Sequence, residues 1–81
     1  MQVMFFGKLA ERIDRQVEIA LPDDAATVAD VRALLAERFP QAREELLKPS
    51  LRACIGDEMV DDAAPVRDAE AVEFFPPLSG G

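Results

Sequence analysis

The sequence predicts an α+β domain in which one main helix packs across a mixed β-sheet. Several short segments have the apolar pattern of strands, one segment has helical spacing, and 81 residues leave room for a single core. A helix with one apolar stripe and strands with one apolar face bury those surfaces against each other. We expect this domain to cover residues 1–75, with residues 76–81 forming an extended C-terminal tail.

Two strands are predicted in the first part of the chain. Residues 1–6 (MQVMFF) form a nearly unbroken apolar run, which is typical of a central strand buried on both faces. Residues 8–13 fit either a helical turn or a loop. Residues 16–21 alternate between apolar and polar side chains, which predicts a half-buried strand paired with the first as a hairpin.

The main helix is predicted directly after this pair. Thr27 has the character of a helix N-cap, and Asp30 stands three residues later, in a position like that of a capping box. Apolar side chains then recur at helical spacing over residues 28–39, and Pro40 ends the helix. Residues 41–47 are compatible with a short second helix.

The last part of the chain predicts further strands. Residues 51–55 form a third strand candidate, followed by a turn at 56–58, a short strand at 59–60 and an acidic loop over 61–71. The final strand is predicted at 71–75. The expected core consists of Val3, Phe5, Val17, Ile19, Val28, Val31, Leu35, Leu51, Ile55, Val72 and Phe74.

Composition excludes several classes of function. Sixteen acidic and nine basic residues give a net charge of −7, which argues against nucleic-acid binding and favours partners with basic surfaces. The chain has no histidine and one cysteine, Cys54, which excludes Ser–His catalysis, the usual zinc sites and an internal disulfide. No apolar run reaches the roughly 18 residues of a membrane span, and a signal-peptide pattern is missing. We therefore expect a soluble, cytoplasmic protein with no metal and no membrane partner.

The ending FFPPLSGG has a distinct physical character. Phe75 precedes a proline, which favours extended backbone, and Pro76 and Pro77 have a fixed φ and no N–H group. Gly80 and Gly81 have no Cβ, so their backbone can enter a passage too narrow for other residues. We expect a tail whose terminal carboxylate is the working group. The sequence has no phosphate-binding loop such as GxxxxGK[ST], so activation of that carboxylate must come from another protein.

The ending FFPPLSGG, together with the opening MQVMFFGKLAER, resembles the family of molybdopterin synthase small subunits. These are ubiquitin-like sulfur carriers, so the resemblance implies the β-grasp fold. It also implies that a ubiquitin-activating-type enzyme adenylates Gly81 with ATP, and that a sulfur donor then leaves a C-terminal thiocarboxylate. The tail would enter the large catalytic subunit of a heterotetrameric synthase and donate sulfur to a cyclic pyranopterin precursor, forming the molybdopterin dithiolene. The chain itself would be a non-catalytic sulfur-donating subunit with no bound cofactor.

Phe75 is the main candidate for docking to a partner. Its place in the alternation turns it away from the helix, and two interpretations stay open: an interface residue, or a core contact on the second face of the sheet. Cys54 is interpreted as a small buried apolar residue, in preference to a sulfur-transfer role. The reactive end is assigned to Gly80 and Gly81. The candidate partner-binding residues are Phe6, Phe75, Pro76, Pro77, Leu78 and Ser79.

Three other functions compete with this reading. A sulfur carrier for thiazole or cysteine synthesis also ends in Gly-Gly, although such carriers typically lack the FFPP that precedes it here. A ubiquitin-like modifier would form isopeptide bonds through Gly81. An interaction domain with an inert, frayed tail is the simplest alternative.

Overall fold

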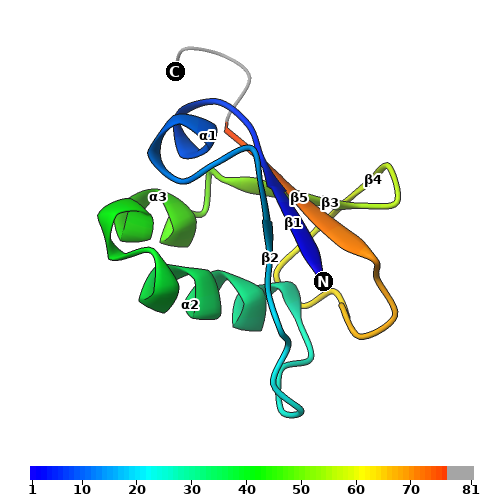
Figure 1. The fold of residues 1–81 in the computed structure, drawn as a ribbon. Coiled ribbons are helices and arrows are strands. Elements are labelled where there is room, and N and C mark those ends of the chain that lie inside the picture. Colours follow the sequence, from blue (N-terminus) through cyan, green and yellow to red (C-terminus); the bar gives the residue numbers. More distant parts are fainter. Residues whose placement is uncertain (77–81) are drawn as a thin grey trace.

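The computed structural model describes residues 1–76 and contains a five-stranded mixed sheet with α2 and α3 on one side (Figure 1). The strands lie in the order β2-β1-β5-β3-β4, in which β1 and β5 are parallel and the other neighbours antiparallel. The predicted α+β class is confirmed. The elements are β1 (Gln2–Phe5), α1 (Lys8–Arg12), β2 (Gln16–Glu18), α2 (Val28–Arg38), η1 (Pro40–Ala42), α3 (Arg43–Leu47), β3 (Arg52–Ile55), β4 (Glu58–Val60) and β5 (Ala71–Phe75).

The first strand is central, as predicted, but it is buried on one face only. Val3 and Phe5 are buried, whereas Met4 is half-buried and Phe6, just after the strand, is 37% exposed. The expectation of burial on both faces is wrong because α2 and α3 cover a single side of the sheet (Figure 1). The other side is open, as is common for sheets that are largely antiparallel.

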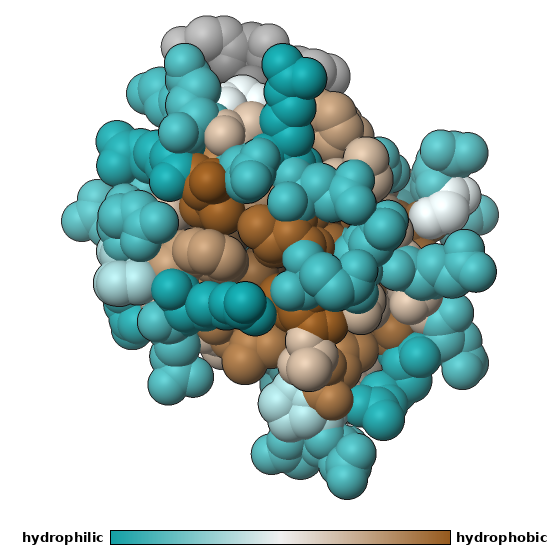
Figure 2. Space-filling model, viewed as in Figure 1, coloured by the Kyte–Doolittle hydropathy of each residue, from teal (hydrophilic) through white to brown (hydrophobic). Residues whose placement is uncertain are grey.

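The core lies between the sheet and the helices. In the view of Figure 2, hydrophobic residues gather in the middle of the molecule and hydrophilic ones cover most of the periphery. All residues of the expected core are buried except Val17 and Ile55, which are half-buried and pack against it. The structure adds buried residues that the sequence pattern did not select, namely Leu9, Ala36, Ala42, Leu46, Ala53 and Val66.

The predicted N-cap of the main helix is present. The Thr27 hydroxyl accepts a hydrogen bond from the Asp30 backbone N–H at 3.3 Å. The Asp30 carboxylate accepts in return from the N–H groups of Ala26 at 2.8 Å and Thr27 at 3.0 Å, which completes a capping box. These donors, Ala26 first and then Thr27, hold the pKa of the Asp30 carboxyl below its ordinary value, because they stabilise the charged form.

The structure shows the conformation of the two segments for which the sequence allowed more than one. Residues 8–13 contain helix α1, and residues 41–47 lie in η1 and α3. The hairpin between β3 and β4 turns through Gly56 and Asp57, both with positive φ, at 57° and 68°. A two-residue turn of this kind matches the twist of the strands that it joins. Within residues 1–76, no helix has the length and apolar character to cross a bilayer.

Arg32 is the only charged residue of the described chain that is buried, at 6% exposed. Its guanidinium donates to the backbone carbonyls of Leu46 at 2.9 Å, Lys48 at 3.1 Å and Leu51, and it forms an ion pair with Asp62 at 2.8 Å. One buried cation thus joins α2 to the end of α3, to the segment before β3 and to the loop after β4. Buried carbonyl oxygens left without a donor would be costly.

Replacing this cation tests its role in stability. We expect Arg32→Met, which keeps the length of the side chain, to lower the free energy of unfolding by about 3 kcal/mol, because three carbonyls lose their donor. Asp62→Asn is the control. The Asp62 side chain is 57% exposed, so losing this ion pair should cost under about 1 kcal/mol. Urea unfolding of the variants measures both values, and equal losses would contradict the assignment.

Candidate functional site

The side of the sheet away from the helices is an open face. Side chains of a strand alternate between the two faces, and paired residues on neighbouring strands share a face. The register therefore assigns one set of residues to this face, each of them half-buried or exposed. They are Gln2, Met4, Gln16, Glu18, Arg52, Cys54, Met59, Ala71, Glu73 and Phe75.

Two phenylalanines stack at the end of the central strands, at the border of this open face. The rings of Phe6 and Phe75 lie 4.4 Å apart between centroids and are inclined by only 6°. The parallel pairing of β1 with β5 continues beyond Phe5, because the Phe6 N–H donates to the Phe74 carbonyl at 3.2 Å. This pairing holds the two aromatic residues side by side. Neither ring belongs to the core cluster.

The chain leaves the sheet directly beside this aromatic pair. Pro76 follows Phe75 and lies against Gly7, the residue that joins β1 to α1. We call the group formed by Phe6, Gly7, Phe75 and Pro76 the tail exit. The sequence pattern identified three of its members and missed Gly7. Only the parallel register, which periodicity does not reveal, brings Gly7 to Pro76.

The Phe75 ring packs on Phe6 and does not belong to the core cluster, so the core interpretation is not supported. Its role at an interface stays a prediction. The remaining predicted site residues lie outside the described part of the chain. They are Pro77, Leu78, Ser79, Gly80 and Gly81.

Cys54 is not a buried core residue, so that expectation is wrong. It is half-buried on the open face, where the register places it between Met59 on β4 and Glu73 on β5. Its neighbour Ala53 takes the core position, because side chains alternate along β3. Across residues 1–76, no group of three histidine, cysteine, aspartate or glutamate side chains is arranged to hold a metal ion.

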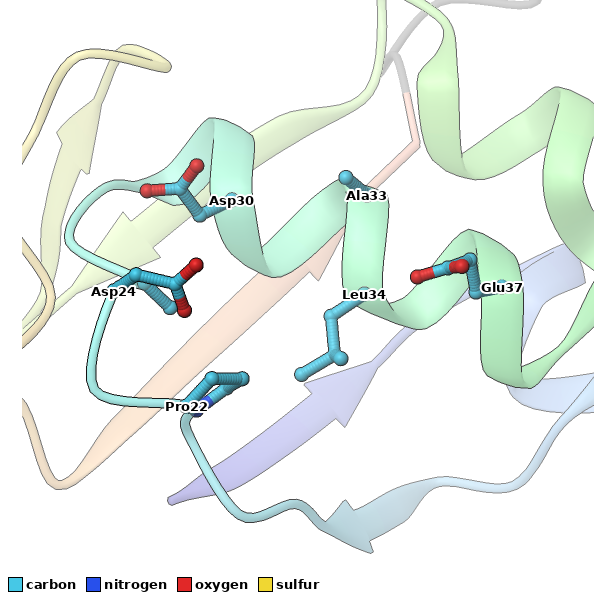
Figure 3. Close-up of a pocket in the computed structure, with 7 residues that line it drawn as sticks. Pro22, Asp24, Asp30, Ala33, Leu34 and Glu37 are labelled. Atoms are coloured by element: carbon cyan, nitrogen blue, oxygen red, sulfur yellow. The ribbon is translucent and has the colours of Figure 1, made fainter.

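A hollow lies between α2 and the loop that precedes it, away from the tail exit (Figure 3). Its rim carries the carboxylates of Asp24, Asp30 and Glu37, with Leu34 and Pro22 between them. Asp30 already serves the N-cap of α2, so its carboxylate has a structural role. We interpret this hollow as surface relief between a helix and a loop, and the tail exit as the candidate site.

Comparison with known proteins gives a consistent result. The model of the ThiS family matches residues 3–81. A molybdopterin synthase sulfur carrier subunit of Haemophilus influenzae is 32% identical over 81 residues, which cover 100% of this chain and 99% of the relative. Both matches include the tail residues as well as the sheet.

Solved structures share the fold. SAMP1 of Haloferax volcanii superposes with a TM-score of 0.81 at 24% identity, covering 99% of this chain and 97% of that chain. A protein of Pyrococcus furiosus assigned as molybdopterin converting factor, subunit 1, superposes with a TM-score of 0.79 at 21% identity, covering 95% of both chains. At these identities the likeness concerns the fold alone. It confirms the predicted β-grasp architecture.

The separation of Phe75 from the core predicts unequal costs for two adjacent phenylalanines. Phe74 is 0% exposed, so Phe74→Ala should lower the free energy of unfolding by about 3–5 kcal/mol through the cavity that it leaves. Phe75→Ala removes mainly the stacking on Phe6 and should cost about 1 kcal/mol. Chemical denaturation of both variants decides the matter. A loss at Phe75 as large as at Phe74 would place Phe75 in the core.

Proposed function

Because the chain belongs to the ThiS family of sulfur carriers, we propose that it is the sulfur-carrier subunit of a molybdopterin synthase, acting in the cytoplasm. One observation carries the proposal. The central strand β5 ends at an aromatic pair in which Phe6 is exposed and Phe75 half-buried, and the sequence PLSGG follows directly after Pro76. In our proposal this pair is the docking patch, and it precedes a segment that ends in two residues without side chains. The full-length match to a molybdopterin synthase sulfur carrier subunit supports this choice.

The chemistry begins at the carboxylate of Gly81. A carboxylate is a poor acyl donor, and its pKa of roughly 3.3–3.7 keeps it charged at neutral pH. It attacks the α-phosphate of ATP in the adenylating enzyme, forming an acyl-adenylate and releasing pyrophosphate. A donor that supplies sulfur at the oxidation level of sulfide then displaces AMP and leaves the thiocarboxylate. Gly80 and Gly81 suit these steps because no side chain obstructs the acyl carbon.

The second half of the cycle takes place in the large catalytic subunit. The thiocarboxylate sulfur forms a bond to a carbon of the cyclic pyranopterin precursor as the C–O bond at that carbon breaks and its oxygen substituent leaves. Water then hydrolyses the acyl–sulfur bond, which leaves the sulfur on the precursor and restores the carboxylate of the carrier. Two such transfers supply the two sulfur atoms of the dithiolene. In this proposal Phe6, Phe75 and Pro76 dock on the large subunit of the heterotetramer. Pro77, Leu78 and Ser79 contact the walls of the passage that the tail enters in that subunit. The carrier binds no cofactor, and ATP is used by the adenylating enzyme.

Docking through the aromatic pair makes a prediction about affinity. We expect Phe75→Ala to weaken binding to the large subunit by about 2 kcal/mol or more, as is usual when a central aromatic anchor is truncated. Leu47→Ala is the matched control. Leu47 is a large apolar residue, 45% exposed, and it lies on α3, on the side of the sheet opposite the open face. Isothermal titration calorimetry with both variants measures the difference. Equal affinities of the Phe75→Ala and Leu47→Ala variants for the large subunit would show that Phe75 is not an anchor of the interface.

The role of Gly81 is tested by blocking or removing its carboxyl group. We expect a non-cleavable C-terminal extension, and separately the deletion of Gly80 and Gly81, to abolish molybdopterin formation. Both changes should leave the melting temperature nearly unaltered, because every residue of the described core cluster lies at or before Phe74. The assay is a reconstituted system of carrier, adenylating enzyme, sulfur donor and large subunit, with intact mass reporting thiocarboxylate formation.

The outcome of this assay distinguishes the competing functions. Loading of Gly81 with sulfur, combined with failure to support molybdopterin formation, would favour a carrier for thiazole or cysteine synthesis. Covalent attachment to lysines of other proteins, without loading by sulfur, would favour a modifier. Substantial molybdopterin production from the extended or deleted form would refute the carrier function outright.

A further inference from the structure

Phe6 and Gly7, which lie between β1 and α1, contact the two residues at which the chain leaves the sheet, Phe75 and Pro76. On one side the Phe6 ring stacks on Phe75 at 4.4 Å. On the other side Gly7 faces the pyrrolidine ring of Pro76: a Cβ built at Gly7 would lie 2.8 Å from Pro76 Cγ and 3.4 Å from Pro76 Cδ. A contact of 2.8 Å is shorter than carbon atoms tolerate, so Pro76 occupies the space that a side chain would fill.

The backbone of Gly7 is fixed in a conformation that favours glycine. Its φ is 67° and its ψ is −138°, a combination that side chains with a Cβ rarely adopt. Its carbonyl accepts hydrogen bonds from the N–H groups of Ala10 at 3.1 Å and Glu11 at 3.4 Å, which form the first turn of α1. Gly7 therefore cannot rotate away from Pro76 without losing the start of this helix.

We propose that Gly7 is a positioning residue of the sulfur carrier, setting the direction in which the chain leaves the folded body at Pro76. The inference rests on the proposed function and adds a residue to it. Pro76 has a fixed φ, so a displacement of its ring also redirects the backbone that follows. Five residues come after Pro76 in the sequence, with a maximal span of roughly 17 Å.

In the proposed function, the reactive carboxyl of Gly81 is joined to the folded body through Pro76. Misplacing a reacting group by about 1 Å can cost on the order of 10²-fold in rate. A displacement of Pro76 changes the point from which the five following residues start, and with it the position from which Gly81 approaches the adenylating centre. The effect should fall on the turnover of the adenylating enzyme, while the aromatic docking pair is retained.

The chain offers a matched control for the cost of positive φ. Gly56 has a φ of 57° and lies in the β3–β4 turn, where a Cβ would meet no atom within 4 Å. Gly7→Ala and Gly56→Ala both place alanine at a positive φ. Only Gly7→Ala also brings a methyl group against Pro76. The two variants share a positive φ and differ in the contact with Pro76, and the Pro76→Ala background separates that contact from the other effects of alanine at position 7.

The experiment is a double-mutant cycle on the full chain with Gly7→Ala, Pro76→Ala, both together, and Gly56→Ala. The adenylating enzyme and sulfur donor load each variant, and intact mass gives kcat and KM for thiocarboxylate formation. We expect Gly7→Ala to lower kcat about tenfold or more with little change in KM, and Gly56→Ala to stay within about twofold of wild type. With alanine already at position 76, the further change Gly7→Ala should cost less than about threefold, because the ring that it displaces is gone.

Two results would overturn the proposal. Equal losses from Gly7→Ala and Gly56→Ala would mean that only backbone strain matters. An undiminished loss from Gly7→Ala in the Pro76→Ala background would mean that position 7 acts through α1 and not through Pro76.

A readout independent of sulfur chemistry separates this proposal from the proposed function. In the free wild-type carrier, NMR should show a nuclear Overhauser effect between the Gly7 Hα and Pro76 Hγ protons. Gly7→Ala should move the Pro76 resonances and the residual dipolar couplings of the residues after it, whereas Gly56→Ala should not. If wild type cannot be loaded but these shifts occur, the sulfur-carrier function fails and the positioning role of Gly7 stands. Unchanged Pro76 resonances in Gly7→Ala would refute the positioning role whatever the loading result.

Discussion

The parallel pairing of β1 with β5 is the constraint on which the candidate site depends. It sets Val3 beside Val72 and Phe5 beside Phe74 in the centre of the sheet. Residues beyond those pairs must then also meet, so Phe6 stacks on Phe75 and Gly7 lies against Pro76. The aromatic patch and the exit of the tail are thus consequences of one strand register and need no separate scaffold.

The two faces of the sheet have different roles, because one packs on the core and the other is open. Phe5 and Phe74 contact each other in the core, with ring centroids 6.2 Å apart, and the Arg32 guanidinium lies 5.5 Å from the Phe74 ring centroid. Phe6 and Phe75 form a second pair, outside the core. Two neighbouring Phe-Phe dipeptides therefore each supply one ring to stability and one ring to a surface. The alternation of side chains along a strand is sufficient to place the two rings of each dipeptide on opposite faces of the sheet.

Much of this architecture follows from local chemistry that a sequence displays. The alternation at 71–75 placed Phe74 and Phe75 on opposite faces of the sheet, and the Thr27–Asp30 spacing located the start of α2. Arg32 was not foreseen, because three of its four partners are backbone carbonyls, which carry no signature in the sequence. Gly7 was missed for a related reason: its positive φ and its neighbour Pro76 are products of tertiary pairing. Burial on both faces of β1 was wrong because an apolar run does not reveal how many layers cover a sheet.

The pairing of Gln2 with Ala71 joins nearly opposite ends of the described chain, and such contacts carry the largest loop-closure cost during folding. The rest of the sheet, the helices and the Arg32 links lie within the segment that this pairing closes. A molecule that has not completed the pairing has no stacked Phe6 and Phe75 and no contact between Gly7 and Pro76. A partner whose binding requires the tail exit therefore cannot bind, through that surface, a chain in which the pairing of β1 with β5 is incomplete.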